Sequence, residues 1–529
     1  MSRVARSEPV FDRYAFLAAA ASGGLLVFAF PPFGFWPAAP VAVAMLSLIV
    51  HGRSAKSGSW YGWIFGLAFC LPLLHWAGTY VGLVPWLLLG LLESAFFCLL
   101  GAGLAIVQRL PFWPAWAAAM WVAEEAFRDR FPFGGLPWGR LAFSQPQGLF
   151  LPYAAIGGAP LLTFVVALTG CLAARAFEAS LSRGQLKLIA LAAAGVLEVP
   201  LIGVALSLTV HSGDQAPHEN IAVIQGNVPR LGLDFDSQRE AVLHNHVNET
   251  LKLARQIRAG QAPKPKIVVW PENASDIDPL DDPAAKALIT HAAQAVGAPI
   301  LVGAILDGPG NHVRNAGIVW DPRTGPGEMY LKRHPVPFGE YIPLRSLARK
   351  VTNKVDLVPR DMVAGDKVGA LQIGGLTVGD VICFEVAYDG LVRSDVTHGA
   401  KILLTQTNNA TFGRTGESPQ QVAIARVRAV EHNRANLVAS TSGISAVIAP
   451  NGKVLKKTGI FTSAILDGPV PIQSGTTLAT RLGALPEWLL TAVGVGALLT
   501  VAGLRVWEAL PERMKKGADG AEDREKERV

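Results

Sequence analysis

Eight apolar stretches, seven of them before residue 211, constrain this chain of 529 residues more than any other feature. Most of them approach the ~20 residues that an α-helix needs to cross a hydrocarbon layer ~30 Å thick. Only 17% of the residues are charged, against roughly 25% in a soluble globular domain. A simple cytosolic enzyme is therefore excluded, and the mean hydropathy of +0.33 excludes a largely disordered chain. The stretches are Tyr14–Phe30, Phe35–Val50, Trp60–Gly78, Val84–Val107, Phe112–Ala126, Ala155–Ala174, Leu188–Val210 and Trp488–Leu504.

The Lys and Arg residues of the short loops predict how these stretches are oriented. They gather in the N-terminal arm and in the loops after the second, fourth and sixth stretches, whereas the turns at 31–34 and 79–83 carry no charge. The N-terminus is therefore expected inside, and only the loop with Arg128, Arg130 and Arg140 runs against this pattern. The predicted segments are a membrane bundle of about seven helices over 1–211, an outer domain over 212–480, a C-terminal transmembrane helix over 481–505 and a charged, disordered cytoplasmic tail over 506–529.

The remaining charged residues bear on nucleic-acid binding and on two acids within apolar stretches. The net charge is +6, with no long basic run and no nucleic-acid-binding motif, so nucleic acid is not an expected partner. Glu93 and Glu198 fall inside predicted helices, where a carboxylate is costly and therefore often functional. A carboxyl that is neutral or paired within the bundle is the commoner situation, and we expect it for both residues.

From residue 218 to about 472 the pattern changes to short β-rich runs separated by helical segments. Strands that alternate with helices indicate an α/β layered domain, and about 255 residues can bury a substantial core without metal or disulfides. No paired metal-ligand motif and no glycine-rich phosphate loop stands out, so neither a metal nor a cofactor is expected. The expected strands are Ile221–Gln225, Ile267–Trp270, Ile300–Ala304, Thr377–Phe384, Ile402–Gln406, Leu437–Thr441 and Ala446–Ile448, and the expected helices are Ser237–Ala259, Ala284–Val296 and Pro419–Asn433.

Three reactive side chains stand at strand ends or in loops of this domain. Glu272 follows an apolar strand, Lys332 lies in a loop rich in proline and aromatic residues, and Cys383 ends a strand, while the other three cysteines lie in apolar stretches. Taken singly, they would be a surface acid, an ion-pair lysine and a buried core thiol. Together they form a set for acyl transfer, because a thiol attacks as thiolate, a glutamate can take its proton, and an ammonium can stabilise both the thiolate and an oxyanion.

The three side chains belong to motifs that occur in a known order. WPEN at 270–273, YLKRHPVPFGEY at 330–341 and VICFE at 381–385 resemble the Glu-Lys-Cys motifs of the carbon-nitrogen hydrolase, or nitrilase, superfamily. With apolar stretches on both sides of this domain, nearly the whole chain resembles the apolipoprotein N-acyltransferases, the membrane-bound members of that superfamily. Two departures stand out: Phe384 where the family often has Tyr, and TNNATFG at 407–413 where TNDAWFG is more usual.

This resemblance implies a multi-span α-helical membrane domain joined to a nitrilase-like αββα sandwich. It also implies that Glu272 is the general base, Lys332 the oxyanion stabiliser and Cys383 the nucleophile. Glu340 and Glu385 match two further family positions that support the site. The backbone N–H of Phe384 is expected to be a second oxyanion donor.

The implied reaction moves a fatty acyl chain from a membrane phospholipid to Cys383, and then from the thioester to the α-amino group of a diacylglyceryl-cysteine at an apolipoprotein N-terminus. A monomer in the bacterial inner membrane, with its catalytic domain in the periplasm, is expected. Two alternatives remain at this point: a membrane-tethered amidase that releases the thioester to water, and a transporter or receptor with Glu93 and Glu198 on its path. The loops at 231–236 and 351–366 are candidate lids over the site.

Overall fold

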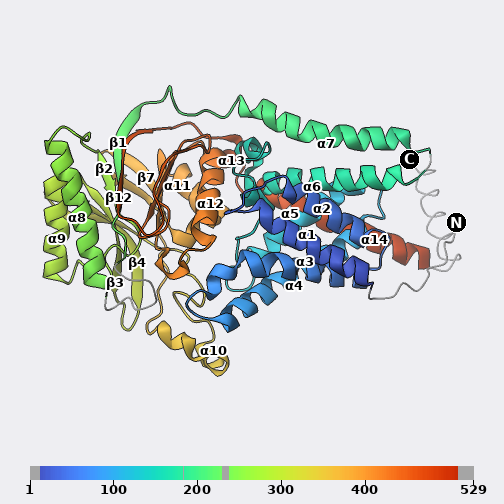
Figure 1. Cartoon of the computed structure of the whole chain (residues 1–529), viewed down its shortest axis with the longest axis horizontal. Coiled ribbons are helices and arrows are strands. Elements are labelled where there is room, and N and C mark those ends of the chain that lie inside the picture. The colour runs from blue at the N-terminus through green and yellow to red at the C-terminus, as the bar shows by residue number, and fades with distance from the viewer. Residues whose placement is uncertain (1–11, 183, 229–237, 510–529) are drawn as a thin grey trace, which may run out of the picture.

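The computed structural model describes residues 12–182, 184–228 and 238–509, which fall into two regions (Figure 1). Apolar helices run side by side in one region, and a β-sandwich flanked by helices forms the other. This is the expected fold class, a helical membrane domain plus an αββα sandwich. The lid predicted at 231–236 lies outside the described residues, as does the predicted tail from 510 onward.

Every predicted apolar stretch is helical. By length and composition, four described helices could cross a membrane: Leu83–Val107, Leu151–Ser180, Leu186–Ser207 and Leu485–Glu508. The remaining ones are shorter or less apolar, so the predicted number of crossings stays a prediction. The helices are α1 (Arg13–Ala29), α2 (Ala38–Val50), α3 (Ala55–Leu73), α4 (Leu83–Val107), α5 (Trp113–Arg128), α6 (Ala154–Ser180), α7 (Leu186–Ser207) and α14 (Leu485–Ala509).

Small residues let α3 and α4 pack closely within the bundle. Gly58 and Gly62 of α3 lie one turn apart, and both face the backbone of α4. A Cβ atom added to Gly62 would lie 2.1 Å from the carbonyl oxygen of Phe97, which no side chain could tolerate. Glycines at this spacing are a common way for membrane helices to approach one another without a hydrophobic driving force.

Two six-stranded sheets face each other in the sandwich, in the orders β12-β1-β2-β3-β4-β5 and β11-β10-β9-β8-β7-β6. β1, β2 and β3 run parallel in the first sheet, and β7, β8 and β9 run parallel in the second. β4 is antiparallel to both β3 and β5, so β5 points the same way as β2. The strands are β1 (His218–Gln225), β2 (Ile267–Val269), β3 (Ile300–Asp307), β4 (Val313–Asp321), β5 (Gly325–Leu331), β6 (Ala370–Ile373), β7 (Leu376–Ile382), β8 (Ile402–Thr407), β9 (Asn436–Ser440), β10 (Ala446–Ile448), β11 (Val454–Lys457) and β12 (Ala464–Pro471).

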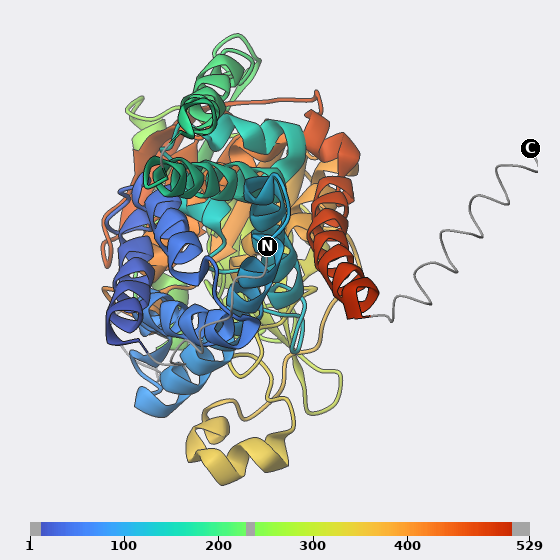
Figure 2. The ribbon, with the colours of Figure 1, turned by 90° about the vertical axis from the view of Figure 1, so that its right-hand side faces the viewer.

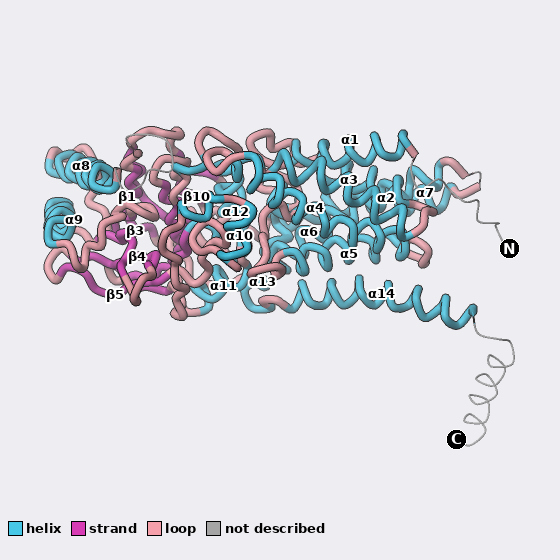
Figure 3. The backbone as a smooth tube through the Cα atoms, turned by 90° about the horizontal axis from the view of Figure 1, so that it is seen from below, coloured by secondary structure: helices cyan, strands magenta, loops and turns pink. Residues whose placement is uncertain are grey.

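Helices cover both outer faces of the sandwich. α8 and α9 lie on the first sheet, at the end of the molecule far from the bundle, whereas α11 and α12 lie between the second sheet and the bundle (Figures 1 and 3). One apolar core fills the space under α8 and α9, and a second lies between the sheets. A third core runs without a break from the bundle helices to α12 and the second sheet. The helices are α8 (Arg239–Arg258), α9 (Pro283–Val296), α10 (Arg345–Val351), α11 (Asp389–Thr397), α12 (Glu417–His432) and α13 (Leu478–Leu482).

The expected strands and helices of this domain are confirmed with small shifts at their ends, but five strands were missed. Four of these, β5, β6, β11 and β12, are the edge strands of the two sheets. Edge strands carry charge, glycine or proline more often than central ones, and sequences such as GPGEMYL and VLKK therefore lack the apolar pattern of a buried strand. The strand expected over Thr377–Phe384 is also corrected: it ends at Ile382, and a 3₁₀ turn, η5 (Cys383–Ala387), follows it.

A separate arm projects from the sandwich beside the bundle. It contains α10 and the short turn η4 (Asn353–Leu357), and it stands away from the rest of the chain (Figure 2). The candidate lid at 351–366 begins in this arm and returns to the sandwich, where Val363 bonds to Val313 and Gly365 to Lys332 through their backbones; its role as a lid stays a prediction.

Candidate active site

Glu272 lies just beyond the carboxyl end of β2 and is buried. Its Oε1 accepts a hydrogen bond of 2.7 Å from the side-chain amide of Asn315, and its Oε2 accepts one of 2.8 Å from the backbone N–H of Asn408. The hydroxyl of Thr441 donates to the backbone carbonyl of the same residue at 2.9 Å. Because partners hold both carboxylate oxygens and the main chain, the orientation of this acid is fixed.

Lys332 follows β5 and is also buried, so β2 and β5 bring a carboxylate and an ammonium to one edge of the first sheet. Its Nζ lies 3.0 Å from Glu272 Oε1 and 2.6 Å from Glu340 Oε1. Burial alone would lower the pKa of Lys332, but the two carboxylates outweigh burial and raise it well above its ordinary value. Lys332 therefore stays an ammonium across the physiological pH range.

Cys383 opens the turn η5 directly after β7, in the left-handed conformation with φ of 56°. A residue other than glycine is strained there by roughly 1–3 kcal/mol and needs support from its surroundings. Its Sγ accepts hydrogen bonds from Thr407 Oγ1 at 3.3 Å and from Gln421 Nε2 at 3.8 Å. Burial raises the pKa of the Cys383 thiol, and the charge of Glu272 raises it further, while Lys332 opposes both. The resting side chain therefore keeps its proton.

Glu385 ties the turn that carries Cys383 to the loop that carries Lys332. Its carboxylate accepts the backbone N–H of Ile382 at 2.8 Å, and on the other side it accepts the N–H groups of Arg333 and His334 at 2.8 and 3.0 Å. The hydroxyl of Tyr330 donates to both oxygens at 2.9 Å. The structure thus places Glu340 against the lysine and Glu385 beneath the cysteine, each in contact with the motif that contains it.

Comparison with known proteins covers both regions of the chain. Residues 22–172 match the model of the apolipoprotein N-acyltransferase N-terminal domain, and residues 220–479 match the carbon-nitrogen hydrolase model. A Mycolicibacterium smegmatis protein named apolipoprotein N-acyltransferase is 43% identical over 517 residues, which covers 93% of this chain and 86% of that protein. The chain belongs to the apolipoprotein N-acyltransferase family. It is therefore an acyltransferase that resides in a membrane, as the motifs predicted.

Two further proteins complete the comparison. A Pseudomonas putida apolipoprotein N-acyltransferase is 31% identical over 498 residues, with 87% of this chain and 92% of that protein covered. An amidase of known structure from Nesterenkonia is 17% identical, with a TM-score of 0.35 over 49% of this chain and 93% of its own.

The candidate site lies where the sandwich meets the helical bundle. The ring of Phe384, next to Cys383, stacks on Trp138 from the loop between α5 and α6, with centroids 5.9 Å apart and planes 16° apart. Gln420 of α12 accepts hydrogen bonds from the indole N–H groups of Trp138 and Trp76, at 2.8 and 3.2 Å. Cys383, which is half-buried, is therefore close to the end of the helical bundle, where the α5–α6 loop and the turn after α3 meet α12.

The arginines that ran against the predicted orientation are paired with acids inside the acyltransferase. Arg128 binds Glu124 at 2.8 Å and Glu93 at 3.4 Å, so the expectation that Glu93 is paired is confirmed. The other pairs are Arg130 with Glu487 and Arg140 with Asp389. An arginine held inside the protein joins segments together and is a weak marker of the membrane side. Glu198, by contrast, is exposed on α7, so the expected pairing within the bundle is not found, and a neutral carboxyl at this position stays a prediction.

Several residues that touch the three reactive groups were missed by sequence reasoning. Asn315 donates to Glu272 and, at 3.3 Å, to Glu340, and Gln421 reaches the thiol from α12. A lone amide in a strand or helix gives no sequence signal of its own. Thr407 and Asn408 did fall in the TNNATFG motif quoted above, which therefore lines the site.

Among the described residues, no group of three or more His, Cys, Asp or Glu side chains could hold a metal.

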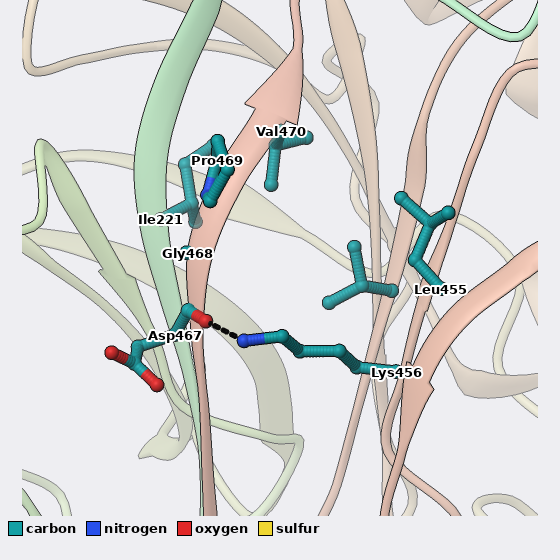
Figure 4. A pocket seen from close by; sticks show the side chains of 8 residues that line it. Ile221, Leu455, Lys456, Asp467, Gly468, Pro469 and Val470 are labelled. Carbon is teal, nitrogen blue, oxygen red and sulfur yellow. Dashed lines mark hydrogen bonds between the residues drawn. The ribbon is translucent and has the colours of Figure 1, made fainter.

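A small surface pocket lies elsewhere, where β12 and β1 meet β10 and β11 (Figure 4). Lys456 spans it and donates to the backbone carbonyl of Asp467. Neither Glu272, Lys332 nor Cys383 lines it. The lining residues are Ile221, Val447, Leu455, Lys456, Asp467, Gly468, Pro469 and Val470.

Proposed function

We propose that this acyltransferase moves a fatty acyl chain from a membrane phospholipid to the α-amino group of the diacylglyceryl-cysteine at the N-terminus of apolipoproteins. The names of its relatives support this substrate class. The observation that carries the proposal is the contact of Lys332 with Glu272, beside the thiol of Cys383, whose neighbour Phe384 stacks on Trp138 from a loop of the bundle.

In the first half-reaction, Cys383 Sγ attacks the ester carbonyl of the phospholipid while Glu272 takes the thiol proton. The oxyanion that forms is stabilised by the Lys332 ammonium and by the backbone N–H of Phe384. The C–O bond then breaks, and the proton on Glu272 passes to the leaving oxygen. The products are a lysophospholipid and an acyl thioester on Cys383.

In the second half-reaction, the neutral α-amine of the apolipoprotein attacks the thioester. Glu272 again accepts the proton lost by the attacking group, and Lys332 again faces the oxyanion. The C–S bond breaks, the sulfur regains a proton, and an amide remains on the lipoprotein. Glu340 and Glu385 support the ammonium and the nucleophile turn from outside the reacting atoms.

The place of the site suits two substrates that are both anchored in lipid. A thiol next to the bundle can meet an acyl chain without leaving the membrane surface, and the same packing keeps water from hydrolysing the thioester.

We further propose that the protein is a monomer in the bacterial inner membrane with its sandwich in the periplasm. The charges of the N-terminal arm and of the loops on its side of the bundle support this orientation.

The direct test compares two cysteine variants in a phospholipid-to-lipopeptide transfer assay. Cys383→Ala should abolish transfer with unchanged yield and unfolding temperature, since only the reacting sulfur is lost. Cys98→Ala, which removes a thiol from α4, is the matched control and should transfer at the wild-type rate. Full activity of Cys383→Ala would overturn the proposal, and release of ammonia from small amides without any acylated lipopeptide would favour an amidase.

A further inference from the structure

The short turn that carries the nucleophile is held at both ends. At its start, Glu385 fastens it to the Lys332 loop through the backbone N–H of Ile382. At its end, Arg428 of α12 donates from Nε to the carbonyl of Val386 at 2.8 Å and from Nη2 to the carbonyl of Ala387 at 2.7 Å. A left-handed Cys383 depends on such restraints, because its own backbone would otherwise relax to an ordinary conformation.

Asp389 extends the restraint at the end of the turn. Its Oδ1 accepts Arg428 Nη2 at 2.5 Å and Arg140 Nη1 at 2.9 Å, and both guanidinium groups are buried. Burial would raise the pKa of Asp389, but the two arginines outweigh burial and hold it well below its ordinary value. Asp389 is therefore a permanent carboxylate that joins the two arginines.

Arg140 belongs to the bundle and not to the sandwich. It lies in the loop between α5 and α6, and its Nε faces Glu125 Oε2 at 3.4 Å and Asp129 Oδ2 at 3.3 Å. A continuous set of charged contacts thus runs from α5 through Arg140, Asp389 and Arg428 to the carbonyls of the nucleophile turn. Charged hydrogen bonds of this kind are directional, and they fix positions that apolar packing would leave adjustable.

We propose that Arg140 is a positioning residue through which the membrane bundle holds Cys383 in its attacking conformation. The inference rests on the proposed role of Cys383 as nucleophile. This role gives the bundle a part in catalysis. Without Arg140, the sandwich would keep Glu272, Lys332 and Cys383 but would lose one support of the turn that carries Cys383. Arg140 touches no reacting atom and acts only through Asp389 and Arg428.

The loop that bears Arg140 offers a matched control. Arg130 binds Glu487 of α14 with two hydrogen bonds of 3.0 and 2.6 Å, and its guanidinium lies over the ring of Trp488. This pair joins the same loop to another helix, but it makes no contact with the nucleophile turn. Loss of Arg130 therefore removes a more exposed ion pair of the same loop without touching the proposed mechanism.

The test uses the full chain in detergent micelles and compares Arg140→Gln, Arg140→Lys and Arg130→Gln. Arg140→Gln should lower kcat by at least ~10-fold with KM within about twofold, because a small displacement of a nucleophile costs rate more than binding. The pH midpoint for alkylation of Cys383 by iodoacetamide should fall toward that of an ordinary thiol, since a displaced Cys383 escapes burial and Glu272. Arg140→Lys should recover part of kcat, and Arg130→Gln should match the wild type in both readouts.

The outcomes distinguish failure of the proposed Arg140 role from failure of the proposed acyl transfer through Cys383. If Arg140→Gln keeps the wild-type kcat and alkylation midpoint in its folded fraction, the inference is overturned. Should Arg140→Gln fail to fold, Asp389→Asn, which keeps size and the acceptor oxygen, must still show both changes, and wild-type values there overturn the inference too. If the wild-type protein itself transfers acyl chains without needing Cys383, the proposed function fails first.

Discussion

The two outer faces of the sandwich are built in different ways. Under α8 and α9, apolar side chains such as Leu253 and Ile289 cover the first sheet and form one core with its strands. Between the second sheet and the bundle, the buried Arg428 and the half-buried carboxylate of Asp389 add directional contacts to the apolar core. The far face stabilises the domain, whereas the face against the bundle also holds the turn that carries Cys383.

The largest expected effect is within the candidate site, at the edge of the first sheet where Lys332 lies. Lys332→Met should lower acyl transfer by at least ~100-fold, because the oxyanion loses its cation and two buried carboxylates lose their shared partner. The initial rate of lipopeptide acylation measures this. Transfer within about threefold of the wild type would show that the ammonium has no part in the transition state.

A substitution under α9 should change stability alone. Ile289 is fully buried on the far face, and Ile289→Ala should cost about 2–5 kcal/mol of unfolding free energy through the cavity it leaves. Denaturant unfolding in micelles gives that value, and kcat per folded molecule should not change. A fall in kcat at this distance from Cys383 would break the contrast between the two faces.

The matched change on the bundle side is Gln420→Ala. The amide of Gln420 contacts both Trp76 and Trp138, so its loss should cost about 1–3 kcal/mol of stability. Because Trp138 stacks on Phe384 beside the nucleophile, kcat should also fall by roughly 3- to 10-fold. Unfolding and transfer assays on the same preparation measure both quantities. A loss of stability at constant kcat would show that Gln420, like Ile289, contributes to stability alone.

The smallest effect concerns the pKa of the thiol. Burial is the main cause of the raised pKa of Cys383 and the Glu272 carboxylate adds to it, so Glu272→Gln should lower that pKa, even though acyl transfer is lost. Alkylation by iodoacetamide, followed from pH 6 to pH 10, should then be faster at pH 8 in the variant than in the wild type. A slower reaction throughout this range would mean that Glu272 does not act on the thiol through its charge.

Sequence reasoning singled out Glu272 and Cys383 because they stand at the ends of apolar strands, and Lys332 because it lies in an ordered loop within a recognisable motif; the contact of Lys332 with Glu272 agrees with that choice. It could not predict that Arg140 meets Asp389 across 249 residues, because a paired and an unpaired arginine look the same in a sequence. The edge strands β5, β6, β11 and β12 were missed for a similar reason, since exposure removes the apolar signal that identified β1 and β8. Local sequence patterns predict which segments are buried, but they do not predict which charged residues pair across long stretches of the chain.

The proposed function requires that the acyl chain form a thioester with Cys383 Sγ, between the sandwich and the helical bundle. The most direct measurement is mass spectrometry of the intact protein and its peptides after incubation with phospholipid but no acceptor. We expect one fatty acyl mass on the peptide that contains Cys383, released by hydroxylamine and lost when a diacylglyceryl lipopeptide is added. An acyl group on a different residue, or transfer that proceeds while Cys383 never carries one, would contradict the account.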